Sequence, residues 1–222
     1  MKGAAIMSLE SGIPMENSAY PASTRYALAR WVSAIVHPVA FPLLTLGLAI
    51  FFVSHSVAEA ARDVTLAVLL TTLPVALLVG LQVLRGRWTD LDVSVRRQRY
   101  ALYPFGVACM LALALAYHAV GAPQVAVRSA EALVLANVAN GLINFTYKVS
   151  AHATGAAASA TLLWLTAPYV GISLAATIAA LLVGWSRVTL KRHTRGQVAL
   201  GWAAGVASML LAQRGLPLPP RL

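Results

Sequence analysis

Charged side chains are scarce in this chain, and acidic ones are the scarcest. Asp, Glu, Lys and Arg make up 11% of the 222 residues, and only seven residues are acidic. Soluble domains usually contain about 25% charged and about 45–50% apolar residues. This chain is 59% apolar, with a mean hydropathy of +0.73. The shortage of charge argues against an ordinary soluble domain and indicates a polytopic membrane protein.

Cysteine pairs and a signal-peptide pattern are also missing. The single cysteine, Cys109, lies in an apolar run, so it supports no disulfide framework, and we interpret it as a small packing residue. The first 26 residues are polar and lack the basic-then-apolar order of a signal peptide. We therefore expect residues 1–26 to form a tail that precedes an uncleaved first span.

The excess of positive charge has a membrane explanation. The 17 Lys and Arg residues against seven acidic ones give a net charge of +10, which in a soluble protein would suggest nucleic acid. Here the basic residues lie at the ends of apolar segments, where they contact anionic lipid head groups and set topology. No RNA- or DNA-reading motif is present, so we expect membrane lipids and no nucleic acid as partners.

Long apolar segments dominate what is present. A spanning helix needs about 20 apolar residues, and seven segments approach that length, although the fifth and sixth are short. They cover residues 28–53, 63–84, 100–121, 126–147, 152–167, 169–185 and 196–213. Pro38 and Pro42 should kink the first segment. The sequence predicts an all-α transmembrane bundle of about six or seven spans, with one domain over residues 27–213 and a short tail at 214–222.

Three short polar clusters interrupt the apolar segments. They are Arg96–Arg99, Lys148–His152, and Ser186-Arg187 with His193. Two spans separate each cluster from the next, so all three should emerge on the same side of the membrane. That side, with the N-terminal tail, holds 13 of the 17 basic residues, and the positive-inside rule places it in the cytoplasm. The balance remains 9 to 4 when the suspected site residues Arg96, Arg99, Lys148 and Arg187 are left out.

The third cluster carries the most specific pattern. Ser186-Arg187, five residues and His193 resemble the last signature, Ser-Arg-x5-His-x3-Asp, of the type 2 phosphatidic acid phosphatase and vanadium haloperoxidase superfamily. Gln197 stands where that family usually has Asp. In the second cluster, Ser150 and His152 are similar to the Ser and His of the family's Pro-Ser-Gly-His.

The first cluster resembles the family's Lys-x6-Arg-Pro motif only loosely. Arg96 and Pro104 fall at the Lys and Pro positions, while Tyr103 occupies the Arg position. Arg99 could supply the missing cation from one helical turn away. The resemblance covers roughly residues 96–201 and points to the membrane lipid phosphate phosphatase branch.

The resemblance implies a set of site residues. His193 would be the nucleophile that forms a phosphohistidine, and His152 would be the acid for the leaving alcohol. Histidine suits both tasks because its ordinary pKa lies near neutrality. Cationic and hydroxyl donors would bind the phosphoryl oxygens, whose charge grows during transfer. These donors are Arg187, Arg96, Lys148, Ser150, Ser186 and Arg99. The scheme requires no metal and no cofactor.

The departure at Gln197 leaves two readings open. A neutral Gln can orient His193 but cannot stabilise its imidazolium as an Asp would. Another carboxylate, Asp90 or Asp92, could compensate and preserve catalysis. Alternatively, the chain has become a non-hydrolytic lipid-phosphate binder or transporter.

A further alternative is an isoprenoid diphosphate prenyltransferase. Asp90-Leu91-Asp92 is similar to one aspartate motif of such enzymes, but no second pair exists, so a magnesium cage is poorly supported. We interpret these acids as neutralising neighbouring arginines. Asn137, Asn140, Asn144 and Lys148 share one helical face, which could bond other helices or form a polar wall leading to a head group.

The sequence therefore favours an integral membrane phosphatase. We expect it to hydrolyse a lipid phosphate or a polyprenyl phosphate or diphosphate at the cytoplasmic face of the cell membrane. We also expect His152, His193, Arg187 and Arg96 to meet in one pocket.

Overall fold

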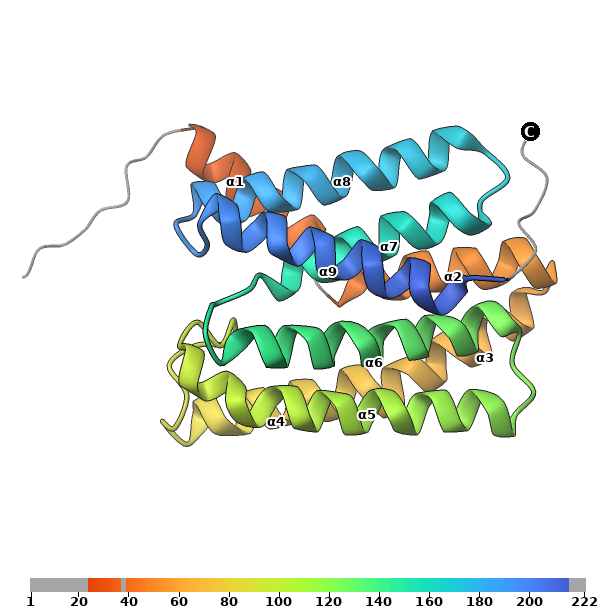
Figure 1. The fold of residues 1–222 in the computed structure, drawn as a ribbon, viewed down its shortest axis with the longest axis horizontal. Helices are drawn as coiled ribbons and strands as arrows, with labels where there is room; N and C mark the ends of the chain where they lie inside the picture. Colours follow the sequence, from red (N-terminus) through yellow and green to blue (C-terminus); the bar gives the residue numbers. More distant parts are fainter. Residues whose placement is uncertain (1–23, 37–38, 216–222) are drawn as a thin grey trace, which may run out of the picture.

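The computed structural model describes residues 24–36 and 39–215, and within those ranges it contains helices and no strand (Figure 1). Most of the two predicted tails, and Pro38, lie outside the described residues. The helices are α1 (Thr24–Ile35), α2 (Ala40–Ser54), α3 (Val57–Ala67), η1 (Val68–Thr72), α4 (Leu73–Leu84), η2 (Arg96–Gln98), α5 (Arg99–Ala119), α6 (Gln124–Asn144), α7 (Ala151–Thr166), α8 (Val170–Thr189) and α9 (Arg195–Gln213). The all-α prediction is confirmed for the described residues.

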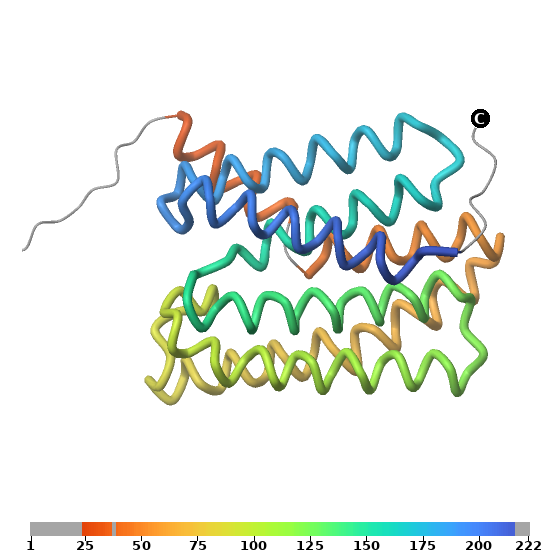
Figure 2. The backbone as a smooth tube through the Cα atoms, viewed as in Figure 1, coloured from red at the N-terminus to blue at the C-terminus, as the bar shows by residue number. Residues whose placement is uncertain are grey.

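The helices run back and forth along one common direction (Figure 2). Loops 85–95, 145–150 and 190–194 lie together at one end, which we call the polar end of the bundle. The shorter connections at 55–56, 120–123 and 167–169 lie at the other end. The three polar clusters therefore emerge on one side of the bundle, as the spacing of the spans predicts.

Several helices are long and apolar enough to cross a membrane. Within residues 24–36 and 39–215, three stretches qualify, namely Val57–Leu84, Arg96–Ala119 and Val170–Thr189, and the bent pair of α1 and α2 adds a fourth if it forms one span. The bend between these two helices is 46°, in keeping with the predicted kink, and Pro42 lies in the first turn of α2. The fold is thus a helical bundle with candidate membrane-spanning helices, and six or seven spans remain a prediction.

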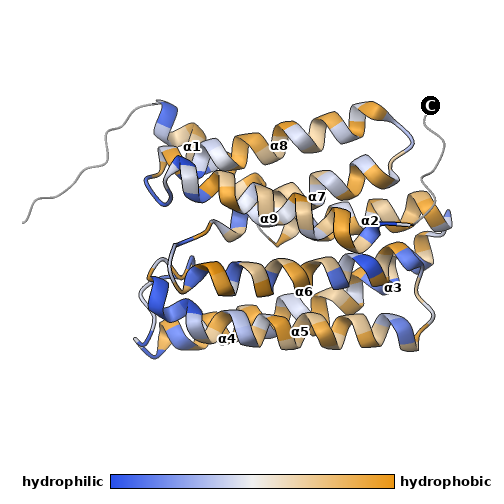
Figure 3. Ribbon diagram, viewed as in Figure 1, coloured by the Kyte–Doolittle hydropathy of each residue, from blue (hydrophilic) through white to orange (hydrophobic). Residues whose placement is uncertain are grey.

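Apolar residues predominate along the helices, and polar residues gather towards the two ends of the bundle (Figure 3). Large hydrophobic side chains are exposed on several helices, among them Leu69, Leu77, Leu115, Ile178 and Leu211. In a soluble protein such a surface would aggregate, whereas a bilayer solvates it. The distribution therefore fits a bundle whose two ends face water.

Helix α7 is the best-buried element, because small residues let its neighbours approach closely. Its alanine-rich sequence packs between α2, α8 and α9. A Cβ atom at Gly201 of α9 would lie 2.7 Å from the backbone oxygen of Ser150, and one at Gly205 would collide with the backbone oxygen of Thr154. Close backbone packing through small residues is typical of membrane helices, and here it fixes the N-terminus of α7 beside the start of α9.

One predicted boundary is wrong. The sixth apolar segment, predicted to be short and to end at residue 185, forms α8, which extends to Thr189 and is long enough to span. The helix continues through Ser186 and Arg187 because both polar side chains find partners. The Ser186 hydroxyl donates to the Val183 carbonyl (2.8 Å), and Arg187 binds Asp92.

Candidate active site

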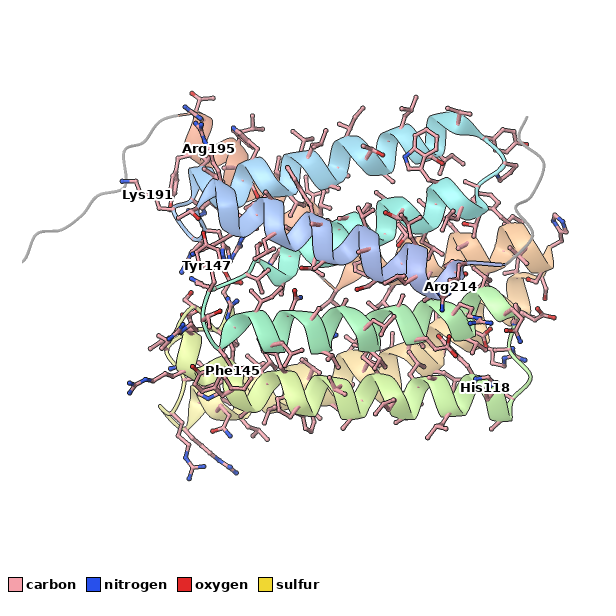
Figure 4. The ribbon with its side chains drawn as sticks, viewed as in Figure 1. His118, Phe145, Tyr147, Lys191, Arg195 and Arg214 are labelled. Atoms are coloured by element: carbon pink, nitrogen blue, oxygen red, sulfur yellow. The ribbon has the colours of Figure 1, made fainter. Side chains whose placement is uncertain are left out.

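Each polar cluster reaches the polar end of the bundle through a helix terminus. Arg96 and Arg99 stand at the start of α5, Ser150 and His152 at the start of α7, and Arg187 in the last turn of α8. In Figure 4, Tyr147, Lys191 and Arg195 lie at this end, while His118 and Arg214 lie at the other. Residues about 35 and 50 positions apart are thereby brought to one region.

Arg187, Asp92 and His152 form the centre of the site. The Arg187 guanidinium is buried, and its Nη2 donates to Asp92 Oδ2 (2.8 Å) while its Nη1 donates to the Ser33 hydroxyl (3.3 Å). Asp92 Oδ1 lies 3.8 Å from His152 Nε2, an ion pair when the imidazole is protonated. The Nε of Arg187 is also buried and has no hydrogen-bond partner among the described residues.

The charges around Asp92 keep it ionised. Partial burial acts to raise the pKa of its carboxyl group, but the hydrogen bond and charge of Arg187 outweigh that effect, with help from His152 and Arg192. The pKa of Asp92 therefore lies below its ordinary value. An ionised carboxylate thus occupies the position beside Arg187 where another anion would bind.

These residues line a cleft of about 260 Å³, which we call the polar pocket. Its polar lining consists of Tyr26, Arg30, Ser33, Asp92, His152, Arg187 and Arg192. Three guanidinium groups against one carboxylate leave the pocket with a positive balance. The polar pocket is therefore suited to an anionic group of phosphate size.

His193 lies beside the polar pocket but does not line it. Its side chain is largely buried, with the residue 7% exposed, and its backbone N–H donates to the Arg187 carbonyl (3.2 Å). Burial lowers the pKa of the imidazole to about 3, assisted by the positive charges of Lys148, Arg99 and Arg187, whereas the Gln197 hydrogen bond acts in the opposite direction. His193 is thus neutral at physiological pH.

Gln197 fixes the tautomer of that neutral imidazole. The Thr194 hydroxyl accepts the backbone N–H of Gln197, and Gln197 Oε1 accepts the backbone N–H of Thr194 (3.2 Å), which together form a capping box at the start of α9. The amide oxygen is therefore the atom that lies 3.0 Å from His193 Nδ1. An oxygen acceptor there requires Nδ1 to carry the proton, which leaves Nε2 with its lone pair.

Lys148 joins two loops of the polar end. Its Nζ donates to the Arg192 carbonyl (3.1 Å). Burial lowers the pKa of its ammonium group, as do Arg99, Arg187 and Arg192, while Asp90 acts to raise it. The contact places a positive charge near His193 and ties loop 145–150 to loop 190–194.

The arginines of the first cluster bind backbone oxygens. Arg96 Nη1 donates to the carbonyls of Phe145 (3.2 Å) and Thr146 (2.9 Å). Arg99 is buried and donates to Val93 (2.7 Å) and Val149 (2.9 Å). Both cations therefore hold the loops of the polar end together, and neither lines the polar pocket.

The predicted serine donors have local partners. Ser150 caps α7 by accepting the Ala153 N–H (3.3 Å), and its own N–H donates to the Gln197 carbonyl (3.2 Å). The Ser186 hydroxyl bonds within α8, and both serines are fully buried. Of the predicted site residues, the structure thus brings His152 and Arg187 into the polar pocket and places Arg96, Lys148, Ser150, Ser186, His193 and Gln197 around it.

Helix α1 contributes residues that sequence reasoning did not select. Tyr26, Arg30 and Ser33 line the polar pocket, although the sequence suggested only a tail and a first span. Their spacing of four and three residues places them on one helical face, which is the signal that was available. Asp92 was considered as a compensating acid, as part of an aspartate motif and as a neutraliser of arginines; the structure pairs it with Arg187 in the polar pocket.

The described residues contain no group of three or more His, Cys, Asp or Glu side chains that could hold a metal ion. Asp90 accepts from the Ser94 hydroxyl (3.0 Å), while Asp92 binds Arg187. The asparagine face of α6 makes contacts to other elements, since Asn140 bonds Thr154 and Asn144 donates to the Arg96 carbonyl.

Fold and site together define an all-helical membrane-type bundle with a cation-rich pocket and two histidines at one end. Residues 123–217 match the family model of the PAP2 superfamily. This match confirms the resemblance to type 2 phosphatidic acid phosphatases and supports a phosphatase-type activity. It includes the second and third polar clusters and leaves Asp92 and the first cluster outside. No significant match was found among curated proteins or among solved structures.

Proposed function

We propose that this chain is a metal-independent phosphoric ester hydrolase that acts through a phosphohistidine on His193. The observation that carries the proposal is the contrast between its two histidines. His193 is buried, neutral and held with Nδ1–H on Gln197, whereas His152 lies beside an ionised carboxylate. Two titratable groups in opposite environments are the usual arrangement for a nucleophile and an acid.

The proposed reaction has two steps. His193 Nε2 forms a bond to phosphorus while the bond from phosphorus to the alcohol oxygen breaks, and His152 gives that oxygen a proton. Water then attacks the phosphohistidine, gives a proton to His152, and releases phosphate and neutral His193. Both steps place His152 in the general acid–base role.

Cations of the polar end would stabilise the transferring group. Arg187 offers a buried guanidinium whose Nε has no other partner, and Lys148 lies close enough to act on the charge state of His193. A phosphoryl group distributes its charge over three oxygens during transfer, so several fixed donors lower the barrier. Arg96, Arg99, Ser150 and Ser186 would support these groups through the loops and helix ends that they hold.

The proposed substrate is amphiphilic. The polar pocket opens at the end of a bundle whose sides are apolar, so a head group can reach it while the tail stays in hydrocarbon. Lipid phosphates and polyprenyl phosphates or diphosphates meet this description. The excess of basic residues at this end supports a location on the cytoplasmic face of the cell membrane.

A phosphate-release assay with these substrates, with and without EDTA, tests the proposal. Release should persist in EDTA and should disappear in His193→Ala. His118→Ala is the matched control, because His118 lies at the opposite end of the bundle beside Glu131. Release that survives the loss of His193 would refute the nucleophile assignment.

The neutral side chain of Gln197 supports a second candidate function, that of a lipid-phosphate binder that no longer hydrolyses its ligand. A neutral amide orients His193 without stabilising the positive charge that the ring carries while Nε2 is phosphorylated. Saturable binding of a lipid phosphate without any release of phosphate would favour this candidate.

A further inference from the structure

A second, partly open cavity lies between the helices of the bundle and differs in character from the polar pocket. It has a volume of about 530 Å³ and lies between α2, the stretch α3–η1–α4, α5, α6 and α7. Cavities that enclose small ligands usually measure about 300–1,000 Å³. We call this space the inner cavity.

The inner cavity joins the site already described. His152 and Asp92 line both the polar pocket and the inner cavity, and Arg99 adds a buried cation at the same end. Along α5 the lining extends from Arg99 to Tyr117. At about 1.5 Å per residue, those 18 steps correspond to about 27 Å. The inner cavity therefore begins at the proposed catalytic acid and follows most of a spanning helix.

Apolar side chains form most of its wall. Val79, Leu102, Met110, Leu113 and Leu133 are among the lining residues. Small residues at other lining positions keep the space open, among them Gly106, Ala136 and Ala158. An apolar cavity does not hold water well, and leaving it empty destabilises a protein. A hydrocarbon ligand would remove that penalty.

The helix on one side of the inner cavity is irregular at the cavity wall. Between α3 and α4 the chain forms a π-helical turn, Val68–Thr72, and two of its residues, Thr71 and Thr72, line the cavity. Such turns are rare and are often found at functional sites. The irregularity is therefore located where a ligand would contact the stretch α3–η1–α4.

We propose that the inner cavity holds the hydrocarbon chain of the phosphate-bearing substrate. The phosphate would lie at the Arg187, Asp92 and His152 end, and a linear prenyl or acyl chain would extend along α5 and α6. This inference rests on the proposed function for the location of the phosphate. The inference adds that the hydrocarbon tail lies within the bundle. Activity should therefore depend on the size of that hydrocarbon tail.

Filling the cavity should separate long substrates from short ones. Ala136→Trp places a large side chain in the inner cavity, and Ala139→Trp is the matched control on the same helix, outside the cavity lining. For a long-chain polyprenyl phosphate, kcat/KM should fall at least tenfold in Ala136→Trp, while hydrolysis of soluble butyl phosphate changes less than twofold. The control should match the unmodified protein on both. An equal loss on both substrates, or no loss on either, would overturn the inference.

A crosslinking experiment tests the same inference without turnover. Long-chain phosphonates that carry a diazirine on the chain, one prenyl and one acyl, are bound to the unmodified protein and photolysed. Adducts should fall on cavity residues such as Met110 and Leu133, and the more efficient probe identifies the kind of chain. Adducts confined to exposed residues such as Leu115 and Leu142 would contradict the inference. Cavity adducts in a protein that releases no phosphate would leave the inference standing and overturn the proposed hydrolysis.

Discussion

Gln197 performs two tasks with one oxygen atom. Oε1 closes the capping box of α9 by accepting the Thr194 N–H, and it holds the Nδ1 proton of His193. An aspartate in the usual family position would add a negative charge to the second task. The chain thus retains the orientation of the imidazole and lacks the carboxylate charge that would stabilise its protonated form.

We predict that Gln197→Glu increases kcat and that Gln197→Ala lowers it. Glu keeps the same length and the same capping box while adding the missing charge, which raises the pKa of His193 and favours the imidazolium. Ala removes a neutral hydrogen bond, worth about 1 kcal/mol, so kcat should fall about fivefold. Steady-state phosphate release measures both. A Glu variant slower than the unmodified protein would contradict this account.

The low pKa of His193 makes a pH prediction. The imidazole must be neutral to attack, and its pKa is lowered to about 3. As the pH falls through the ordinary pKa of histidine, kcat/KM should therefore not decrease. Lys148→Gln removes a positive neighbour, which raises the pKa of His193 and moves the acidic limb to higher pH. Lys191 is exposed on loop 190–194, the loop that carries His193, and Lys191→Gln should leave the limb in place. Identical profiles for both variants would count against the proposed electrostatics.

Asp92 is predicted to affect catalysis and substrate binding in opposite directions. Asp92→Asn removes the carboxylate beside His152, so kcat should fall, and it frees Arg187 for the substrate, so KM should also fall. Loss of a hydrogen bond to a charged group lowers the free energy of unfolding by about 1–3 kcal/mol. The midpoint of thermal unfolding should therefore be lower in Asp92→Asn. Asp90→Asn is the control, since Asp90 bonds Ser94 and Thr89 instead. A rise in KM without a change in kcat would contradict the assignment.

At the scale of elements, the contact of α9 with α7 positions the site. Gly201 and Gly205 allow the two backbones to meet, and this contact places the Ser150 N–H on the Gln197 carbonyl (3.2 Å). The starts of α7 and α9 are thereby held in register. His152 and His193 belong to the two helix starts that this contact joins.

We predict that Gly205→Ala destabilises the bundle and that Gly80→Ala does not. A Cβ at Gly205 collides with the α7 backbone, and overpacking of this kind costs about 1–3 kcal/mol. Nothing lies within 4 Å of a Cβ at Gly80 in the middle of α4, where Ala should stabilise the helix by about 0.5–1 kcal/mol. Thermal unfolding in detergent compares the two. Equal midpoints would show that the α7–α9 contact is looser than described.

Helix positions were largely predictable, while their local irregularities were not. Among the described residues, each of the seven apolar segments is mostly helical, because hydrocarbon-length apolar runs satisfy their backbone groups only as helices. The π-helical turn at Val68–Thr72 was not predicted, although Pro74, which has no backbone N–H to continue the helical ladder, lies just after it. The length of α8 was underestimated because Arg187 looked like a boundary, whereas its pairing with Asp92 keeps it inside the helix.

At the scale of the whole molecule, convergence of the clusters could be predicted from topology alone. Two spans separate each cluster from the next, so the chain returns to the same end, where Arg187 and His152 share the polar pocket. The partners of Arg96 and Arg99 could not be predicted, because they are backbone carbonyls of loops whose shape no motif specifies. Helix α1 contributes Tyr26, Arg30 and Ser33 to the polar pocket. The only signal for them in the sequence was their spacing along one helical face, because this segment carries no family motif.

The central claim is that His193 carries the phosphoryl group. Rapid quenching of the enzyme during turnover of a long-chain lipid phosphate, followed by mass spectrometry under alkaline conditions that preserve phosphohistidine, tests it directly. The account predicts one phosphoryl group on the peptide that contains His193, formed equally in EDTA and absent from His193→Ala. A phosphoryl group on any other residue, or turnover with no phosphorylated enzyme at all, would contradict it.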